Sequence, residues 1–383
     1  MKPTVKLASL LMAMLMMISV IASGCSFGKE WSYKTDVKEL PIGVYITALY
    51  ESYSEAQTYA SKLDDYDASS DKWLELEITD DDGNTEVASK WIKQQAEKKC
   101  LELLAMEAEL DKLGASLDEA KITQTDNQAE MYWVQGMKKL LEGKGVSLDS
   151  FKYFFSHYSL AKNTLFDSLY LEGGSKAVSK DEISKYFEEN YIQYSYLPVS
   201  LYEATADESG ALVNAITDEK AKKITDTLDS YAKQVNAVKD ATEAGTTLDK
   251  LVTDYITANG LDENAKVTGT AVKDETNAPA DEINDALKKL EEGKAVTLKV
   301  GKETDATYYL VFRYSTATAK STYLTDGTHD SEIIHKMKDD TYKDYLKDLV
   351  DDLDYQKNNA VDGYDPKIFF EKPKESSGSA ENQ

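Results

Sequence analysis

The sequence predicts a mostly helical α+β protein, and three observations support this fold class. Between residues 85 and 190, apolar residues recur at helical spacing. Between 191 and 317, short alternating runs typical of strands stand on both sides of several helical stretches. Beyond Lys336 the helical spacing returns and continues to Tyr355. The chain is therefore expected to contain a helical part, then a small α+β unit, then helix again.

The composition is that of a globular, acidic protein. The chain has 383 residues, 44 basic and 69 acidic, and a formal net charge of −25. Arg313 is its single arginine, and no cluster of lysines replaces the missing arginines, which argues against a nucleic-acid partner. The length suggests two or three domains. The negative charge has two open interpretations: solubility, or attraction to basic polypeptides or metal cations.

The first residues have the pattern of a lipoprotein signal peptide. Lys2 and Lys6 precede an uncharged apolar run, residues 7–21, which is short for a membrane span. Small residues then lead to Cys25, as in a lipobox. We expect cleavage after residue 24 and acylation of Cys25, with palmitate or a similar chain, on the extracytoplasmic face of a membrane. An ordinary signal peptide that happens to precede a cysteine is the alternative.

The segment after Cys25 is predicted as a polar tether, residues 25–40, followed by the first structured elements. Residues 41–60 alternate like a strand and then take helical spacing. Alternation over 74–78 predicts a short strand that ends at a turn, Asp82-Gly83. The adjacent acidic run, 80–84, does not match the ligand spacing of an EF-hand and is interpreted as an acidic turn.

The helical part is rich in aromatic residues. Helices are predicted over 87–113, 131–141 and 147–170, and a capping box at Ser179–Glu182 begins another. Cys100 lies in an apolar helical stretch and is predicted to be a buried thiol. The 25 tyrosines are either core residues or a contact surface for extended polypeptides. Four aromatic residues on several sides of one helix are candidates for such a surface: Tyr153, Phe154, Tyr158 and Tyr170.

The pattern of residues changes in the middle of the chain. A run rich in β-formers, 194–205, contains Pro198, which favours an edge or a bend. Three helices are predicted next, over 218–237, 247–258 and 280–292, and two strands follow, over 296–300 and 308–312. After the helix that ends at Tyr355, residues 365–370 are predicted to be extended and 371–383 disordered.

This order of elements resembles the foldase lipoproteins of the PrsA type and the related SurA periplasmic chaperones. The resemblance is distributed along the chain. Val178–Asn190 resembles the helix that leads into the parvulin unit, and Leu287–Val300 resembles a parvulin helix and the turn after it. The family's closing helix and the segment after it are resembled by Ser331–Tyr355 and then Asn359, Ala360, Tyr364 and Pro366. The resemblance implies a helical chaperone domain, 41–190 with 318–370, interrupted by a parvulin-like prolyl isomerase domain, 191–317.

The parvulin active site departs from the family pattern. Parvulins carry a pair of histidines on their central strands, but none of the three histidines here lies between 191 and 317. The positions that resemble the two histidines hold Tyr196 and Tyr309. The resemblance therefore implies a parvulin scaffold without its catalytic residues, and leaves open whether the protein is an enzyme.

Other catalytic motifs are absent from the sequence. There is no G-x-S-x-G, no H-E-x-x-H, no P-loop and no dinucleotide-binding glycine motif. His157 and His335 are interpreted as helix-face residues and His329 as a turn residue rather than as metal ligands. No metal or cofactor is expected.

These observations predict a membrane-anchored extracytoplasmic folding factor that binds unfolded or nascent secreted polypeptides. An active isomerase with a non-standard site, for which Tyr196 and Tyr309 would be responsible, is one alternative. A ligand-binding or structural surface lipoprotein is another. The resemblance favours a Gram-positive envelope over a Gram-negative periplasm, and the oligomeric state stays open, with a homodimer among the choices.

Overall fold

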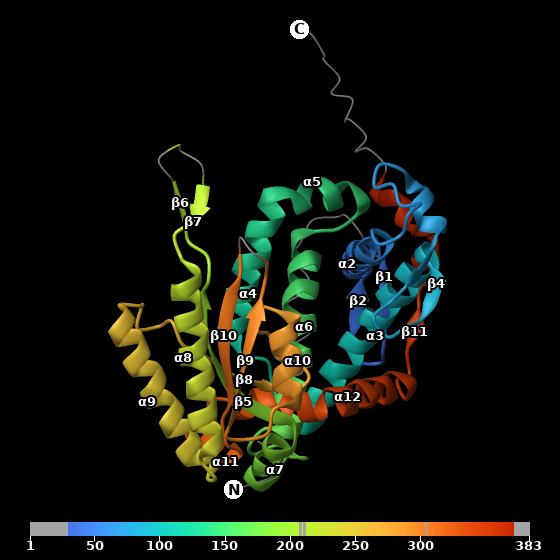
Figure 1. Cartoon of the computed structure of the whole chain (residues 1–383). Helices are drawn as coiled ribbons and strands as arrows, with labels where there is room; N and C mark the ends of the chain where they lie inside the picture. The colour runs from blue at the N-terminus through green and yellow to red at the C-terminus, as the bar shows by residue number, and fades with distance from the viewer. Residues whose placement is uncertain (1–29, 207–208, 210–211, 303–304, 371–383) are drawn as a thin grey trace, which may run out of the picture. The chain divides into compact units, whose positions relative to one another are not determined.

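The computed structural model describes residues 30–206, 209, 212–302 and 305–370 (Figure 1). The chain forms two compact units, one built from residues up to Leu169 and from Asp340 onward, the other from Tyr170 to Asp339. We call them unit 1 and unit 2. Both combine helices with small sheets, so the predicted fold class, α+β and mostly helical, is confirmed.

Unit 1 is built around two long helices, α2 (Ile42–Ala60) and α3 (Ala88–Leu113), which pack on each other. Their facing residues are apolar, and most of α2 is buried. The helix α3 ends at Gly114, which adopts the left-handed conformation common after a helix. The remaining elements of its N-terminal part are η1 (Asp71–Glu75), β3 (Glu77–Thr79), β4 (Thr85–Val87), α4 (Glu119–Tyr132), η2 (Trp133–Met137), α5 (Lys138–Leu141), η3 (Glu142–Lys144) and α6 (Leu148–Tyr170).

A three-stranded antiparallel sheet joins the two ends of the described chain in unit 1. Its order is β11 (Gln356–Lys357), β1 (Trp31–Lys34) and β2 (Glu39–Pro41). The prediction of a polar tether over 25–40 is therefore wrong from Trp31 onward, where Tyr33 and Leu40 are fully buried. The two runs are too short to give a strand signal of their own, and one of the two partners of β1 is a segment more than 300 residues away.

The C-terminal segment continues into the aromatic core of unit 1. It contains two short 3₁₀ helices, η4 (Asn359–Gly363) and η5 (Pro366–Phe369), so the predicted extended end is wrong. The ring of Phe369 lies 5.2 Å from those of Tyr50 and Tyr53, measured between centroids. Late residues of the chain thus complete a core that early residues began.

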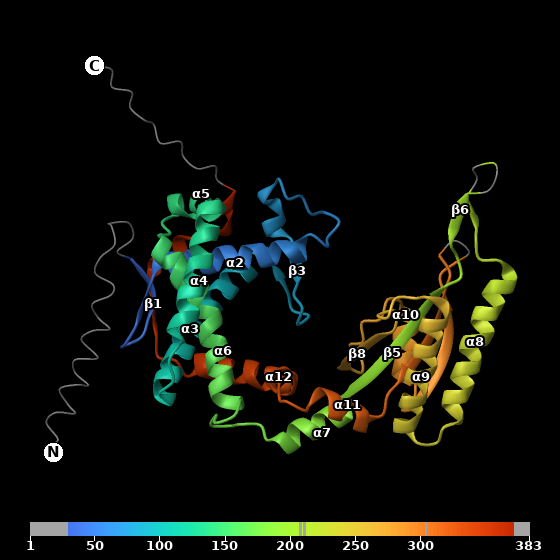
Figure 2. The same cartoon turned by 90° about the vertical axis from the view of Figure 1, so that its left-hand side faces the viewer.

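Unit 2 is built on a four-stranded antiparallel sheet in the order β8-β5-β10-β9. The strands are β5 (Tyr191–Ser200), β8 (Val267–Val272), β9 (Lys294–Val300) and β10 (Thr307–Arg313). After β5, the short strands β6 (Ala204–Ala206) and β7 (Leu212–Asn214) form a hairpin that extends past the sheet (Figure 2). The two central strands are β5 and β10.

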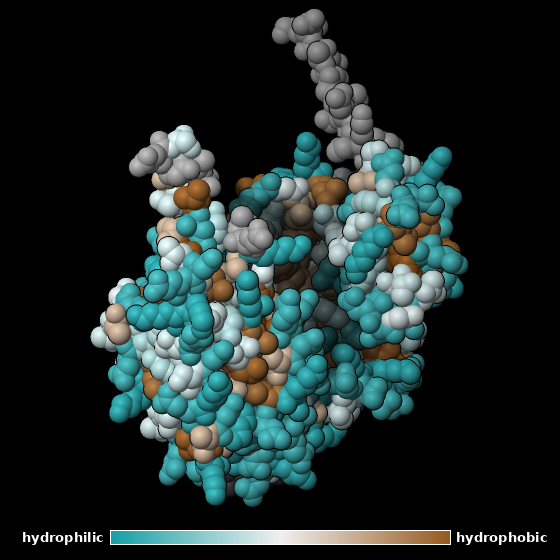
Figure 3. Space-filling view, viewed as in Figure 1, coloured by the Kyte–Doolittle hydropathy of each residue, from teal (hydrophilic) through white to brown (hydrophobic). Residues whose placement is uncertain are grey.

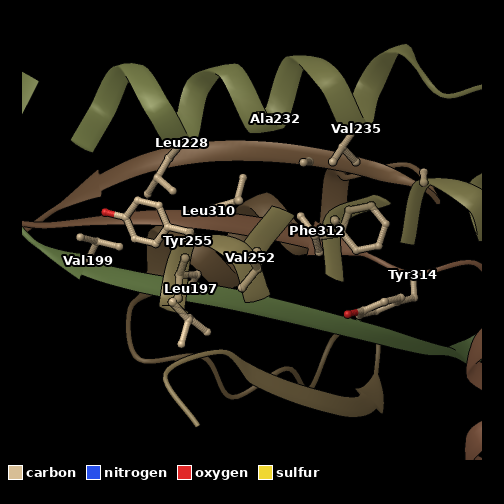
Figure 4. Close-up of a cluster of buried hydrophobic side chains, with 14 residues drawn as sticks. Leu197, Val199, Leu228, Ala232, Val235, Val252, Tyr255, Leu310, Phe312 and Tyr314 are labelled. Carbon is tan, nitrogen blue, oxygen red and sulfur yellow. The ribbon is translucent and has the colours of Figure 1, made fainter. Parts of the chain in front are cut away.

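Two long helices cover one face of this sheet. They are α8 (Asp218–Ala237) and α9 (Ala241–Asn259). Leu228, Ala232 and Val235 of α8 point toward the sheet, where they meet Leu310 and Phe312 (Figure 4). The bounds of α8 match the prediction, and its N-cap is Thr217, whose hydroxyl accepts a hydrogen bond from the Lys220 backbone.

Shorter helices complete unit 2. They are α7 (Lys180–Asn190), α10 (Asp281–Lys289), α11 (Thr316–Tyr323) and the first part of α12 (Asp330–Asp351). The predicted capping box of α7 is confirmed, with Ser179 and Glu182 bonded reciprocally.

Several element bounds differ from the sequence predictions. The whole of α2 is helical, including the stretch that alternates like a strand, because burial on all sides gives it no polar face to set a helical period. The strand expected over 74–78 is a 3₁₀ turn followed by β3. The strand β8 was missed because Thr-Gly-Thr breaks its apolar alternation.

Candidate functional site

The two faces of the unit 2 sheet are covered unequally. On the face of α8 and α9, the apolar residues of β5, β9 and β10 are buried, apart from the partly buried Tyr308. The other face is covered by α10, a helix of nine residues, whose Ile283 and Leu287 pack on Ile192, Tyr194 and Val311. Because α10 is short, it covers only part of its face, and apolar strand residues beyond it stay partly exposed.

We call these residues the open patch. They share one face of the sheet, carry no charge and are all partly exposed or exposed: Tyr196, Pro198, Val267, Leu298, Val300 and Tyr309. In Figure 3, hydrophobic side chains gather over the strands β9 and β10. An uncharged, partly exposed cluster from four strands is a candidate surface for apolar ligands.

Strand register brings the two tyrosines together. Tyr196 stands opposite Val267 on one side and Val311 on the other. Tyr309 stands opposite Pro198 and Leu298. The Tyr196 and Tyr309 rings meet edge to face, with centroids 6.1 Å apart and planes at 62°. The residues singled out by resemblance are therefore neighbours on the open patch.

Local sequence explains why this end of the sheet stays open. Pairing between β5 and β8 ends at Tyr196. Pro198 follows two residues later, and it has no N–H to offer another strand. Further along β8, Gly269 stands opposite Tyr194. A Cβ on Gly269 would lie 2.8 Å from the Tyr194 ring, so the glycine lets that ring approach the strand closely.

The open patch can bind apolar groups but has little means of proton transfer. Burial raises the pKa of the Tyr196 phenol, and the neighbouring Tyr194 and Tyr309 raise it further. The phenol therefore stays neutral at physiological pH and acts as a hydrogen-bond donor or acceptor. No histidine or cysteine lies anywhere between 191 and 317. The site suits aromatic and aliphatic contact with a polypeptide better than acid–base chemistry.

The three histidines have partners elsewhere in the fold. His157 lies 3.1 Å from the Glu107 carboxylate, and His335 lies 3.0 Å from Asp339. His329 stacks on Tyr323 at 3.7 Å between ring centroids. None of them lies on the four-stranded sheet.

The four aromatic candidates of helix α6 pack closely within the fold. Phe154 and Tyr170 are 4% and 2% exposed, so a polypeptide cannot reach them in this conformation. Tyr153 donates to Glu107 at 2.6 Å and Tyr158 donates to Glu102 at 2.5 Å.

These contacts join α6 to α3. Burial, and then the negative charge of Glu107, raise the pKa of Tyr153. The half-buried Tyr153 and Tyr158 are thus anchored by carboxylates of the neighbouring helix.

The N-terminal predictions lie outside the described residues. These are the signal peptide, residues 1–24, and the acylated Cys25, and the tail over 371–383 is outside them too. Cys100 is buried as predicted, and burial raises the pKa of its thiol. Within 30–370, apart from the short gaps, no helix combines the length and apolar character needed to cross a bilayer. Over the same residues, no three metal-ligating side chains gather.

Sequence reasoning missed four members of the open patch: Pro198, Val267, Leu298 and Val300. The alternation of Val296, Leu298 and Val300 signalled that these residues share one face of a strand. It could not show which face α10 leaves open, because that depends on the length of α10 and on where β8 stops pairing.

Comparison with known proteins finds similarity in structure only. No family model matches the chain, and no curated protein matches it. Two similar solved structures are the foldase protein PrsA of Lactococcus lactis and that of Streptococcus pneumoniae. The first is 11% identical, with a TM-score of 0.33, over 89% of this chain and 98% of the other. The second is 12% identical, with a TM-score of 0.33, over 77% and 99%. Both are foldases of the PrsA type, the type that the sequence resembles.

Proposed function

We propose that this protein is a membrane-anchored extracytoplasmic folding factor that holds unfolded secreted polypeptides without catalysing prolyl isomerisation. The open patch is the observation that carries the proposal. It is an apolar, partly exposed surface of the parvulin-like region, and two tyrosines stand where the family resemblance expects histidines. In this proposal 41–190 with 318–370 form the chaperone domain around the parvulin-like region 191–317.

Physical chemistry supports holding over catalysis. Tyrosine offers a large contact area with few rotatable bonds, and its ring accepts many kinds of apolar partner. Binding the unfolded form of a client removes it from the pool that aggregates. Rotation about an X-Pro bond requires crossing a barrier of about 18–20 kcal/mol. The open patch offers only neutral phenols and aliphatic groups, which provide little means of lowering that barrier.

A second function has one specific observation in its favour. The Tyr196 and Tyr309 rings are in contact and partly exposed, so their hydroxyl groups could replace the missing histidines as hydrogen-bond donors to a prolyl carbonyl. This arrangement would make the protein an isomerase with a non-standard site.

A refolding assay separates the two functions. We would use the chain from Ser26 onward, which keeps every described residue, and a client whose slow refolding phase is limited by X-Pro isomerisation. The proposal expects less aggregation at stoichiometric protein and an unchanged slow phase. A slow phase that accelerates at substoichiometric protein would establish catalysis instead. No effect on aggregation or rate across several clients would favour a ligand-binding or structural lipoprotein.

Two variants sharpen the same assay. Tyr196→Phe with Tyr309→Phe keeps both rings and removes both hydroxyls. If the patch only holds clients, this double variant suppresses aggregation as well as the parent chain. If the hydroxyls catalyse isomerisation, the acceleration of the slow phase is lost while the holding activity remains.

The proposed anchor has its own test. Cys25→Ser in the full chain removes the thiol to which the lipid would be attached. We expect the parent chain in the membrane fraction with incorporated palmitate label, and the variant without the label. Equal labelling of the two chains would contradict anchoring through Cys25. Sedimentation of the soluble chain would decide whether a homodimer forms.

A further inference from the structure

Unit 1 contains a groove that the proposed function does not use. It has a volume of about 430 Å³ and lies between α3 and the segment that ends α12. Its lining combines apolar and polar side chains from the two segments: Gln94, Glu97, Lys98, Leu101, Val350, Asp351, Leu353 and Tyr355. All of these residues belong to unit 1.

The apolar part of the groove is formed by Leu101, Val350, Leu353 and Tyr355. Leu101 is 5% exposed and forms part of the core beneath the groove. Val350 and Leu353 are half-buried, and Tyr355 is 37% exposed, which is high for a large hydrophobic residue. The Tyr355 ring is held in place by Tyr33, whose centroid lies 6.2 Å away. The groove therefore has room and apolar surface for a side chain that the described chain does not supply.

Four aspartates belong to the segment that forms one side of this groove, and one of them, Asp351, lines it. Asp348, Asp351, Asp352 and Asp354 are all exposed. In the part of the chain that the structure describes, none of these four forms an ion pair. Glu97 across the groove differs, because Lys357 lies 3.6 Å from its carboxylate. The side of the groove formed by the end of α12 therefore carries negative charge without ion pairs of its own, while Lys98 on the α3 side lies 3.9 Å from the Glu102 carboxylate.

We infer that this groove binds a cationic apolar segment of an unfolded polypeptide. An apolar side chain enters between α3 and the end of α12, and a neighbouring lysine or arginine lies over the four aspartates. The inference rests on the proposed function, since it names the kind of client segment that unit 1 selects. This occupant is favoured because its positive charge complements the negative charge of the aspartates. A second copy of the chain, with its net charge of −25, would bring like charge to the same place.

The expected binding has two separable contributions. Apolar contact in the groove is insensitive to salt, whereas attraction to exposed aspartates is screened, with a Debye length of about 10 Å at 0.1 M salt. Affinity for a cationic peptide should therefore fall as salt is added. It should then level off at the contribution of the apolar side chain.

Two fluorescent peptides test the inference directly with the chain from Ser26 onward. Both are unstructured and contain a phenylalanine flanked by charged residues, which are lysines in one peptide and glutamates in the other. Fluorescence anisotropy gives the dissociation constant of each. We expect the lysine peptide to bind at least about tenfold more tightly at low salt, on the scale of two or three exposed charge pairs.

Matched variants locate the site. Gln94→Trp places a bulky ring in the groove from an exposed position of α3, and Gln128→Trp is the same change at an exposed position of α4 away from it. Asp351→Asn, Asp352→Asn and Asp354→Asn together remove three charges beside the groove. Asp36→Asn, Asp64→Asn and Asp65→Asn remove three exposed charges elsewhere in unit 1. We expect the two groove variants to weaken the lysine peptide about tenfold and the two controls to leave it unchanged.

The outcomes separate this inference from the proposed function. Equal binding of the lysine peptide by the groove variants and the controls would contradict peptide binding in the groove. Equal affinity of the parent chain for the two peptides would also contradict it. If the protein suppresses aggregation in either case, the proposed function stands and the inference about the groove is wrong. If the groove variants lose the peptide while the parent chain suppresses no aggregation, the groove stands as a peptide site and the folding function fails.

Discussion

The two faces of the four-stranded sheet in unit 2 are covered by helices of different length. On one face, α8 and α9, helices of 20 and 19 residues, bury residues of three strands, and Phe312 and Leu310 are 0% and 2% exposed. On the other face, α10 has nine residues and leaves Tyr196 and Tyr309 partly exposed. Tyr309 and Leu310, which are neighbours in β10, thus differ in burial, because successive side chains of a strand point to opposite faces.

The apolar residues of the two faces therefore have different roles, stability on one face and binding on the other. The face under α8 and α9 is a completed core, so its apolar residues stabilise the fold. The open patch has the same kind of residues without a completed cover. Its exposed apolar area contributes less to stability and remains available to a partner. Substitutions on the two faces should therefore have different consequences.

The largest effect is expected from opening the covered face. Phe312→Ala removes a fully buried ring that packs against Tyr314, with centroids 4.8 Å apart. We expect a loss of about 3–5 kcal/mol in the free energy of unfolding. Tyr309→Ala, three residues earlier on the open face, should cost about 1 kcal/mol. Urea unfolding of the two variants would measure both, and equal losses would contradict the distinction between the faces.

An intermediate effect is expected where the open face is packed most tightly. Gly269→Ala places a Cβ 2.8 Å from the Tyr194 ring, which must move. We expect a loss of about 1–3 kcal/mol. Combining Gly269→Ala with Tyr194→Ala should remove the clash, so that the two losses are not additive in a double-mutant cycle. Strict additivity would show that the ring does not depend on the glycine.

A smaller effect is expected from the polar contact beneath α8. Hydrogen bonds from Thr297 and Tyr308 lower the pKa of Asp229. A carboxyl group whose pKa is lower in the folded state stabilises the fold above its unfolded pKa, and that stability is lost as the pH falls below about 4. Asp229→Asn should cost under about 1 kcal/mol at pH 7. A cost that stays constant from pH 7 down to pH 2.5 would contradict the assignment.

The smallest effect on stability is expected from the exposed edge of the open patch. Val267 is 39% exposed and Val213, in the hairpin of β6 and β7, is 40% exposed. Val267→Lys and Val213→Lys should each change the free energy of unfolding by less than about 0.5 kcal/mol. Thermal unfolding would verify that both variants are folded before their binding is compared.

Local signals in the sequence predicted much of the fold. The helix α8 is marked by a threonine cap, acidic residues in its first turn and a regular apolar stripe. The strands β9 and β10 are marked by alternation. What could not be predicted depends on distant partners. The strand β1 pairs with β11, and Phe369 joins an aromatic cluster begun by Tyr50, although each segment alone is short and partly polar.

The residues of the candidate site also differ in how far the sequence could predict them. Tyr196 and Tyr309 could be named by resemblance, and their contact follows from the strand register. Phe154 and Tyr170 seemed suited to a contact surface because they crowd one helix, yet both are buried. The number of aromatic residues on a helix does not reveal how many neighbouring elements pack around it. The exposure of Val267 and Pro198 depends on where β8 and α10 end.

The most direct test of the account compares client holding by Val267→Lys and Val213→Lys. The two substitutions are identical in chemistry and matched in exposure, and only the first introduces a charge on the open patch. Light scattering of an aggregating client would be followed with each variant and with the parent chain. We expect the Val267→Lys variant to lose most of its ability to suppress aggregation and the Val213→Lys variant to retain it. Equal suppression by both variants would contradict the claim that the open patch holds clients.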